Sequence, residues 1–173
     1  MTISMYQASI PVFNHMFENL IHILESGEAF ARDKQFDVEI LLDSRLAPDM
    51  FPLSRQIQIA TDVARRGVAR LAGEEPEQVA DNEQTLDEFY DRIRSTMTRL
   101  DGYRQDQIDG SEDRPISVKV RDMTLNFTGQ DFLLTFMIPN IYFHITTAYV
   151  ILRHNGVALG KADFLGNIGS KSS

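Results

Sequence analysis

Cysteine is absent from this sequence of 173 residues, and cations are scarce compared with anions. Without cysteine the chain has no disulfide, no thiolate metal ligand and no cysteine nucleophile. The absence also fits a reducing compartment, so we expect a cytoplasmic protein. Lys and Arg number 17 against 25 Asp and Glu, which gives a formal net charge of −8. That charge argues against binding to nucleic acid or to an acidic membrane surface, since both need a basic face.

A basic n-region of a signal peptide is also lacking. Only one segment, Phe132 to Leu152, is free of charged residues and long enough to cross a bilayer. It contains Pro139, Asn140 and His144, and no second membrane-like segment accompanies it. We therefore expect it to be the central helix of a soluble bundle, and we predict no membrane partner.

The length suits a single domain, which we place at residues 1–166 and follow with a flexible tail at 167–173. Apolar residues repeat at three- and four-residue spacing along most of the chain, as in helices with one buried face. The predicted long helices are about 5–30, 52–72, 85–101 and 129–155. A short helix is predicted near 38–43, and residues 161–166 are expected to pack on the other helices.

Local signals mark the ends of the middle helices. Gly73 is expected to end the second long helix as its C-cap. Thr85 and Glu88 have the spacing of a capping box, which opens the third. The acidic run between these helices, residues 74–83, is predicted to be a solvated loop.

Between the third and fourth long helices the apolar period changes from 3.6 to 2 residues. Ile116, Val118 and Val120 alternate with polar residues, and a similar alternation follows Arg121-Asp122. This pattern predicts a small β-hairpin at about residues 115–128, although its turn lacks the favoured glycine. The fold class predicted from the residues is all-α with one inserted hairpin.

Two histidines lie on the first predicted helix, opposite its apolar stripe. His15 and His22 share a face, which a helical projection places toward solvent. Two turns of helix separate their rings, so two solvated histidines are a simpler interpretation than a metal-binding pair.

The fourth predicted helix is apolar nearly all round but carries a row of hydrogen-bonding groups. Asn140, His144 and Thr147 fall within one sector, while Tyr149 lies on another side. Pro139 removes the hydrogen bond to the Thr135 carbonyl and is expected to kink the helix here. We expect His144 to be a buried, neutral imidazole whose pKa lies below its usual value, because burial disfavours the charged form.

Three explanations of the polar row stay open. In the first, Asn140 and His144 form a structural network with the freed carbonyl and with Gln56 or Asp49 on the second long helix. In the second, the same residues line a ligand pocket with Tyr149 as one wall. In the third, His144 joins a carboxylate and an amide around a metal ion.

Asp49 is singled out by its position between Pro48 and Pro52, just before the second long helix. A carboxylate there can accept hydrogen bonds from free backbone N–H groups of the first helical turn. We predict that Asp49 caps this helix or bonds to a neighbouring polar side chain.

Two segments carry a family resemblance, Arg45 to Gln56 and Pro139 to Gly166. Together they closely resemble a bacterial and fungal family of unknown function that is grouped with the DinB/YfiT-like helical bundles. The resemblance extends over nearly the whole chain. It implies a four-helix bundle with one long crossover, which agrees with the helices and hairpin predicted above.

Relatives in the wider superfamily resemble metal-dependent thiol transferases or hydrolases, with one His on the second helix and a His-x-x-x-His pair on the fourth. Here the second long helix has no His, and Asn140 and Ala148 stand four residues from His144. A three-histidine site is therefore not available.

We predict a small-ligand-binding or stress-related protein that forms a homodimer and needs no cofactor. The candidate binding residues are Asp49, Gln56, Asn140, His144, Thr147 and Tyr149. The alternative is a metal-dependent transferase or hydrolase with a degenerate site, in which a divalent metal would bind at His144.

Overall fold

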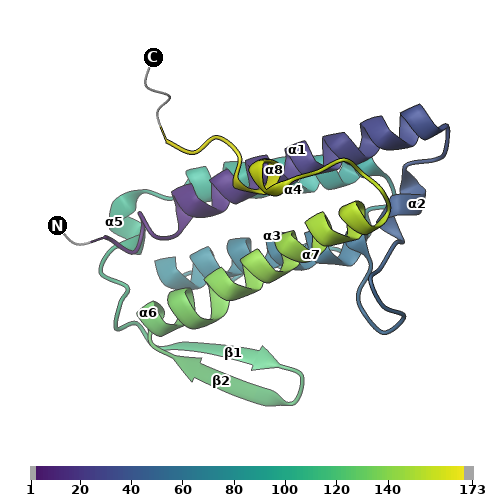
Figure 1. Cartoon of the computed structure of the whole chain (residues 1–173). Coiled ribbons are helices and arrows are strands. Elements are labelled where there is room, and N and C mark those ends of the chain that lie inside the picture. The colour runs from purple at the N-terminus through teal and green to yellow at the C-terminus, as the bar shows by residue number, and fades with distance from the viewer. Residues whose placement is uncertain (1–2, 170–173) are drawn as a thin grey trace.

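The computed structural model describes residues 3–169, and it is mostly helical with one small two-stranded sheet (Figure 1). Four long helices form its body: α1 (Ile10–Lys34), α3 (Leu53–Ala72), α4 (Leu86–Asp101) and α7 (Ile138–His154). The shorter elements are α2 (Glu39–Leu42), α5 (Gln105–Ile108), β1 (Ile116–Val120), β2 (Met123–Phe127), α6 (Gly129–Asp131), the π-helical η1 (Phe132–Met137) and α8 (Lys161–Leu165).

The long helices enclose one apolar core. α3 packs against both α7 and α4, and α1 packs against the same two helices. Four phenylalanines are among the fully buried side chains: Phe13, Phe17, Phe89 and Phe132. Burying one such ring stabilises the fold by roughly 1.5–3 kcal/mol relative to exposing it, so this core holds the four helices together.

The predicted helix ends are confirmed for α3 and α4 but are shifted for α1. Gly73 ends α3 with a positive φ of 79°, and Thr85 and Glu88 form the predicted capping box of α4. The first helix begins at Ile10, later than predicted, because the Ser9 hydroxyl donates to the Met5 carbonyl in a preceding turn. A hydroxyl that bonds backward in this way competes with the regular helix.

The predicted hairpin is present and turns at Arg121-Asp122. Val120 pairs with Met123 in an antiparallel register, and Arg121 takes a positive φ of 54° where the glycine is missing. After the hairpin, the chain packs against the helical body at Gly129. A Cβ atom at that position would overlap the carbonyl oxygen of Ser111, so only glycine fits there.

A π-helical turn, η1, runs directly into α7 where the kink was predicted. Pro139 is the second residue of α7, so the change from π-helical to α-helical bonding falls where the proline lacks a backbone donor. η1 packs closely on α3. The Met137 side chain lies where a Cβ atom of residue 67 would be, so this contact requires Gly67.

By length and composition alone, the continuous helical stretch Gly129–His154 could cross a membrane. The mean hydropathy of its most apolar window is 1.2, and 39% of that window is buried. Its inner side packs against α3 and α1, as expected for a central helix. That the chain has no membrane partner stays a prediction.

The short helix α8 returns to cover one face of α1. The His15 ring donates from Nε2 to the Leu165 carbonyl over 2.8 Å, and the Asn19 amide donates to the Phe164 carbonyl over 3.0 Å. His22 stays exposed beside Asp163. The prediction that both histidines face solvent is therefore wrong for His15. Of the predicted tail, residues 167–169 are exposed, and 170–173 lie outside the described residues.

Candidate functional site

A buried hydrogen-bonded pair, Gln56 and His144, joins α3 to α7. Gln56 is 2% exposed and His144 8%. The imidazole Nδ1 lies 2.7 Å from the Gln56 Oε1, and the Gln56 amide nitrogen donates to the Phe51 carbonyl over 3.0 Å. Since the amide oxygen can only accept, Nδ1 carries the proton of a neutral ring. Of the three open explanations, this is a contact of the first, with Gln56 and not Asp49 as the partner.

The charge state of His144 follows from its surroundings. Burial, and secondarily the positive charge of Arg55, lowers the pKa of His144 to about 4. The ring is therefore neutral at pH 7, and the predicted direction of the shift is confirmed.

The other two members of the polar row bond to their own helix. Asn140 donates from its amide to the Phe136 carbonyl, and Thr147 donates from its hydroxyl to the Phe143 carbonyl, both over 2.7 Å. The predicted bond from Asn140 to the Thr135 carbonyl is not the one that forms. Among the three, only His144 reaches a hydrogen-bond partner on another described element.

The two remaining candidates lie apart from this pair. The Tyr149 ring packs edge-on against Phe164, with 6.1 Å between the ring centroids. Asp49 is exposed, and α3 begins after Pro52 without any side-chain cap. The prediction that Asp49 caps this helix is therefore wrong. Because Pro52 occupies the cap position, a prolyl ring stands where a capping carboxylate would be needed.

The metal site implied by the superfamily resemblance does not fit these side chains. Among residues 3–169, no three His, Cys, Asp or Glu side chains gather closely enough to hold a metal ion. The Nδ1 of His144 and the amide of Asn140 are also engaged within the protein. A closed zinc site needs four ligands and a catalytic one needs three, so this donor set is too small.

Sequence reasoning missed a buried cation, Arg92 on α4. Its guanidinium is 5% exposed and contacts three carboxylates: Asp62 at 2.8 Å, Asp81 at 3.0 Å and Glu83 at 2.7 Å. Its Nε also donates to the Thr61 hydroxyl over 2.8 Å. Of the predicted solvated loop, Asp81 and Asn82 are exposed as predicted, but Glu83 is partly buried against this cation. One available signal was the position of Arg92, three residues after the buried Phe89 on the inward face of the helix.

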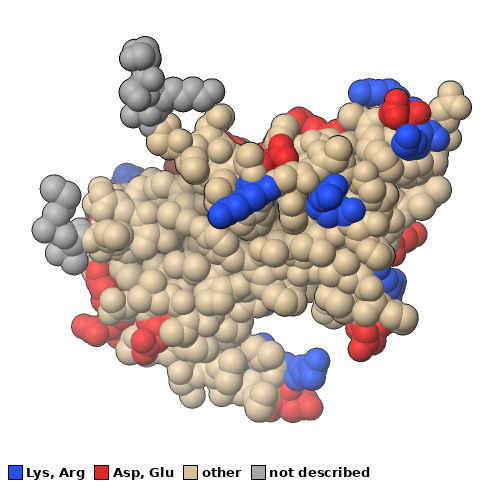
Figure 2. Space-filling view, in the orientation of Figure 1, with Lys and Arg blue, Asp and Glu red and all other residues tan. Residues whose placement is uncertain are grey.

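A second missed feature is a cavity of about 450 Å³ between α3 and the hairpin, which we name the hairpin hollow. Figure 2 shows a notch between the hairpin and the helical body. Its lining is partly cationic and partly apolar: Arg55, Ile59, Asp62, Val63, Arg66, Gly67, Arg70, Val118, Lys119, Val120, Phe132 and Phe136.

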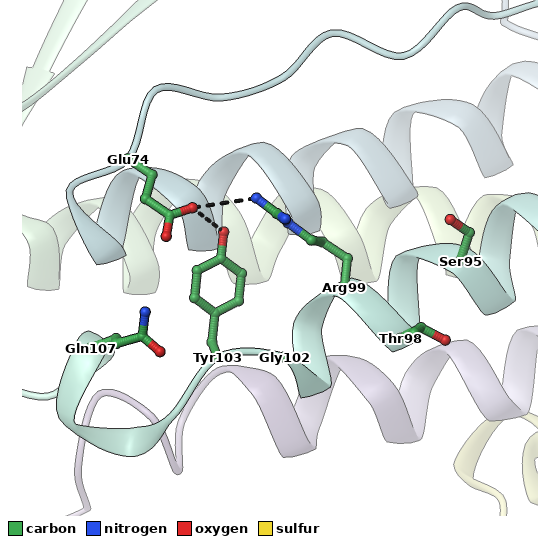
Figure 3. A pocket seen from close by; sticks show the side chains of 7 residues that line it. All are labelled: Glu74, Ser95, Thr98, Arg99, Gly102, Tyr103 and Gln107. Carbon is green, nitrogen blue, oxygen red and sulfur yellow. Dashed lines mark hydrogen bonds and ion pairs between the residues drawn. The ribbon is translucent and has the colours of Figure 1, made fainter.

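Another cavity, of about 530 Å³, lies beside α4, and the charged side chains that line it are paired with each other. Figure 3 shows Arg99 and Tyr103 converging on the Glu74 carboxylate. The tyrosine hydroxyl donates over 2.8 Å and the guanidinium lies at 3.4 Å. Burial and the neighbouring carboxylate raise the pKa of Tyr103. This cavity thus presents a charge cluster that is already paired, unlike the hairpin hollow.

Comparison with known proteins gives a consistent result. A family model described as "Domain of unknown function (DUF1993)" matches residues 5–165. A crystal structure of a DinB family member protein from Shewanella denitrificans is 43% identical in sequence, with a TM-score of 0.87. The match covers 97% of this chain and 95% of that one. None of the curated proteins matches the chain.

Proposed function

The chain belongs to the DUF1993 family, with a DinB-like fold, and from that premise we propose that it binds a small molecule without using a metal ion. One observation carries this proposal. The spacing that holds a histidine pair in the metal-dependent relatives is occupied here by Asn140 and His144, and both side chains bond within the protein. The hairpin hollow has the size of an ordinary ligand pocket.

The proposed architecture is a DinB-like four-helix bundle with a long crossover and an inserted hairpin. Its support is the ring of contacts in which α1 touches α4, α4 touches α3, α3 touches α7 and α7 touches α1. The hairpin and η1 fall within the long connection from α4 to α7.

The proposed assembly is a homodimer in the cytoplasm, with the outer face of α7 and η1 as the contact surface. Leu134, Phe143 and Val150 are exposed on these elements. Figure 2 shows a band without charged side chains over α7. A second copy of the chain would remove this apolar surface from water. Sedimentation of the wild type and of Phe143→Glu tests the proposal, which a monomeric wild type would contradict.

The metal-free proposal is tested by elemental analysis of protein purified without a metal-affinity tag. We expect no stoichiometric transition metal. One metal ion per chain that is lost in His144→Ala would contradict the proposal and favour the transferase or hydrolase alternative. His22→Ala is the matched control, because His22 is exposed and lies away from α7.

A further inference from the structure

The hairpin hollow concentrates positive charge in a protein whose formal net charge is −8. Four cationic residues are among those that line it, and Asp62 is the single carboxylate among them. Three of the cations come from α3 and the fourth, Lys119, comes from β1. With Phe132 and Phe136 from η1, the hollow is therefore built by three elements, and α3 is far from the other two in the sequence.

The charges of the hollow are not balanced by one another. Asp62 is already bonded to Arg92 at 2.8 Å and to Arg65 at 3.0 Å, and Arg55 is paired with Asp81. No carboxylate among residues 3–169 forms an ion pair with the remaining cations, Arg66, Arg70 and Lys119.

Two of these three cations stand in an unfavourable position. Arg66 and Arg70 are four residues apart on α3, where like charges repel across one helical turn. Burial and the charge of Arg66 lower the pKa of Arg70, against the opposing effect of Glu75. The Nε of Arg66 is buried without a hydrogen-bond acceptor. A bound anion would relieve the repulsion and supply acceptors.

The rest of the lining is apolar. Val118 and Val120 face the hollow from β1, so Lys119 between them lines its edge with the backbone and directs its side chain to the exposed face of the strand. Phe132 and Phe136 stack on each other with 5.4 Å between their centroids. Such a surface favours a ligand with an apolar body and disfavours a fully hydrated inorganic ion.

We propose that the hairpin hollow binds a small organic anion, with its carboxylate or phosphate at Arg66 and Arg70 and its apolar body against β1 and η1. This inference rests on the proposed small-molecule-binding function and names the ligand class. The two arginines supply the anion contacts, while the hairpin strand and the phenylalanine pair select for an attached hydrocarbon or aromatic group.

The test is a titration of ¹⁵N-labelled protein with four probes, followed by the backbone amide shifts of residues 66–70 and 118–120. Phenyl phosphate and benzoate carry both an anion and a ring, benzyl alcohol carries only a ring, and inorganic phosphate carries only an anion. We expect saturable shifts at the hollow with one or both organic anions. The other two probes should bind at least about tenfold more weakly, a difference of 1.4 kcal/mol. The preferred organic anion distinguishes a phosphate ester from a carboxylate.

The charge variant is Arg66→Gln with Arg70→Gln, and its matched control is Lys34→Gln with Arg94→Gln, which changes the net charge equally at exposed positions outside the hollow. We expect the first to weaken binding about tenfold or more and the control to stay within about twofold. Because Arg66 and Arg70 have no ion-pair partner in the described chain and repel each other, the charge variant should unfold at the wild-type temperature or above it. Equal loss in both variants would overturn the proposal.

Two further outcomes separate this inference from the function on which it rests. Binding of benzyl alcohol elsewhere on the protein, without any shift at the hollow from the organic anions, would overturn the anion site and leave small-molecule binding intact. A thermal-shift screen of neutral and charged fragments in which nothing binds would overturn both.

Discussion

Two buried polar sites contact different faces of α3, and they offset the cost of burying polar groups in opposite ways. Gln56 and His144 form a neutral pair in which each group bonds to one neighbour. Arg92 instead stays charged, with three carboxylates around it. A buried neutral pair needs only matched hydrogen bonds, whereas a buried charge needs enough opposite charge to offset its desolvation. The neutral site therefore depends on two helices and one carbonyl just before α3, whereas the charged site depends on carboxylates from the distant end of a loop.

The largest effect is expected at the charged site. Arg92→Ala leaves Asp62, Asp81 and Glu83 without their shared cation, which should cost about 3–5 kcal/mol of unfolding free energy. Urea denaturation measures this, with Arg94→Ala on the same helix as an exposed control that should lose less than about 1 kcal/mol. Adding Asp62→Asn, Asp81→Asn and Glu83→Gln to the Arg92 variant should recover part of the loss. No recovery would mean that packing, and not uncompensated charge, dominates this site.

A smaller loss of unfolding free energy is expected at the neutral site. Gln56→Leu keeps the side chain's approximate size but leaves the His144 Nδ1–H and the Phe51 carbonyl without their partner, at a cost of about 1–3 kcal/mol. Thermal or urea unfolding measures the change, and Gln78→Leu in the exposed loop should stay within about 0.5 kcal/mol. A Gln56 variant as stable as the wild type would show that the pair contributes nothing to the packing of α3 on α7.

The neutral site should also make the stability of the protein depend on pH in acid. The folded-state pKa of His144 is about 4, so the unfolded chain, with a value near 6.5, takes up the proton first as the pH falls. Stability from the neutral ring is complete above pH 6.5 and is lost progressively toward pH 4, by about 1 kcal/mol between pH 7 and 5.5. His144→Asn cannot titrate, and its amide nitrogen can take the place of Nδ1, so it should lack this slope. Urea midpoints measured across that pH range test this dependence, with His22→Asn as the control. Parallel stability curves for the His144 variant and the wild type would contradict the assignment of the slope to His144.

The smallest effect is expected at Asp49, which the sequence singled out and the structure leaves exposed. Asp49→Ala should change the unfolding free energy by less than about 0.5 kcal/mol, since the carboxylate caps no helix. A loss above about 1 kcal/mol in urea would restore a structural role for it.

The parts of the structure that could be predicted depend on local patterns. The Gln56–His144 bond follows from two clear helical periods that place both side chains at one helix contact. Arg92 could not be assigned, because two of its three carboxylates, Asp81 and Glu83, come from a loop whose sequence is that of a solvated segment. His15 was misplaced since the covering helix α8 follows it 150 residues later at Leu165. The hairpin hollow was missed because it depends on how the hairpin folds over α3, which no local pattern encodes.

The packing of α8 on α1 affects the kinetics of folding and unfolding. A contact between residues so distant in sequence closes a large loop, and its entropic cost delays such a contact relative to the local pairing of α3 with α4. Interactions that form after the folding transition state leave the folding rate nearly unchanged and slow unfolding instead. We therefore expect the two backbone bonds from His15 and Asn19 to lengthen the lifetime of the native state more than they hasten its formation.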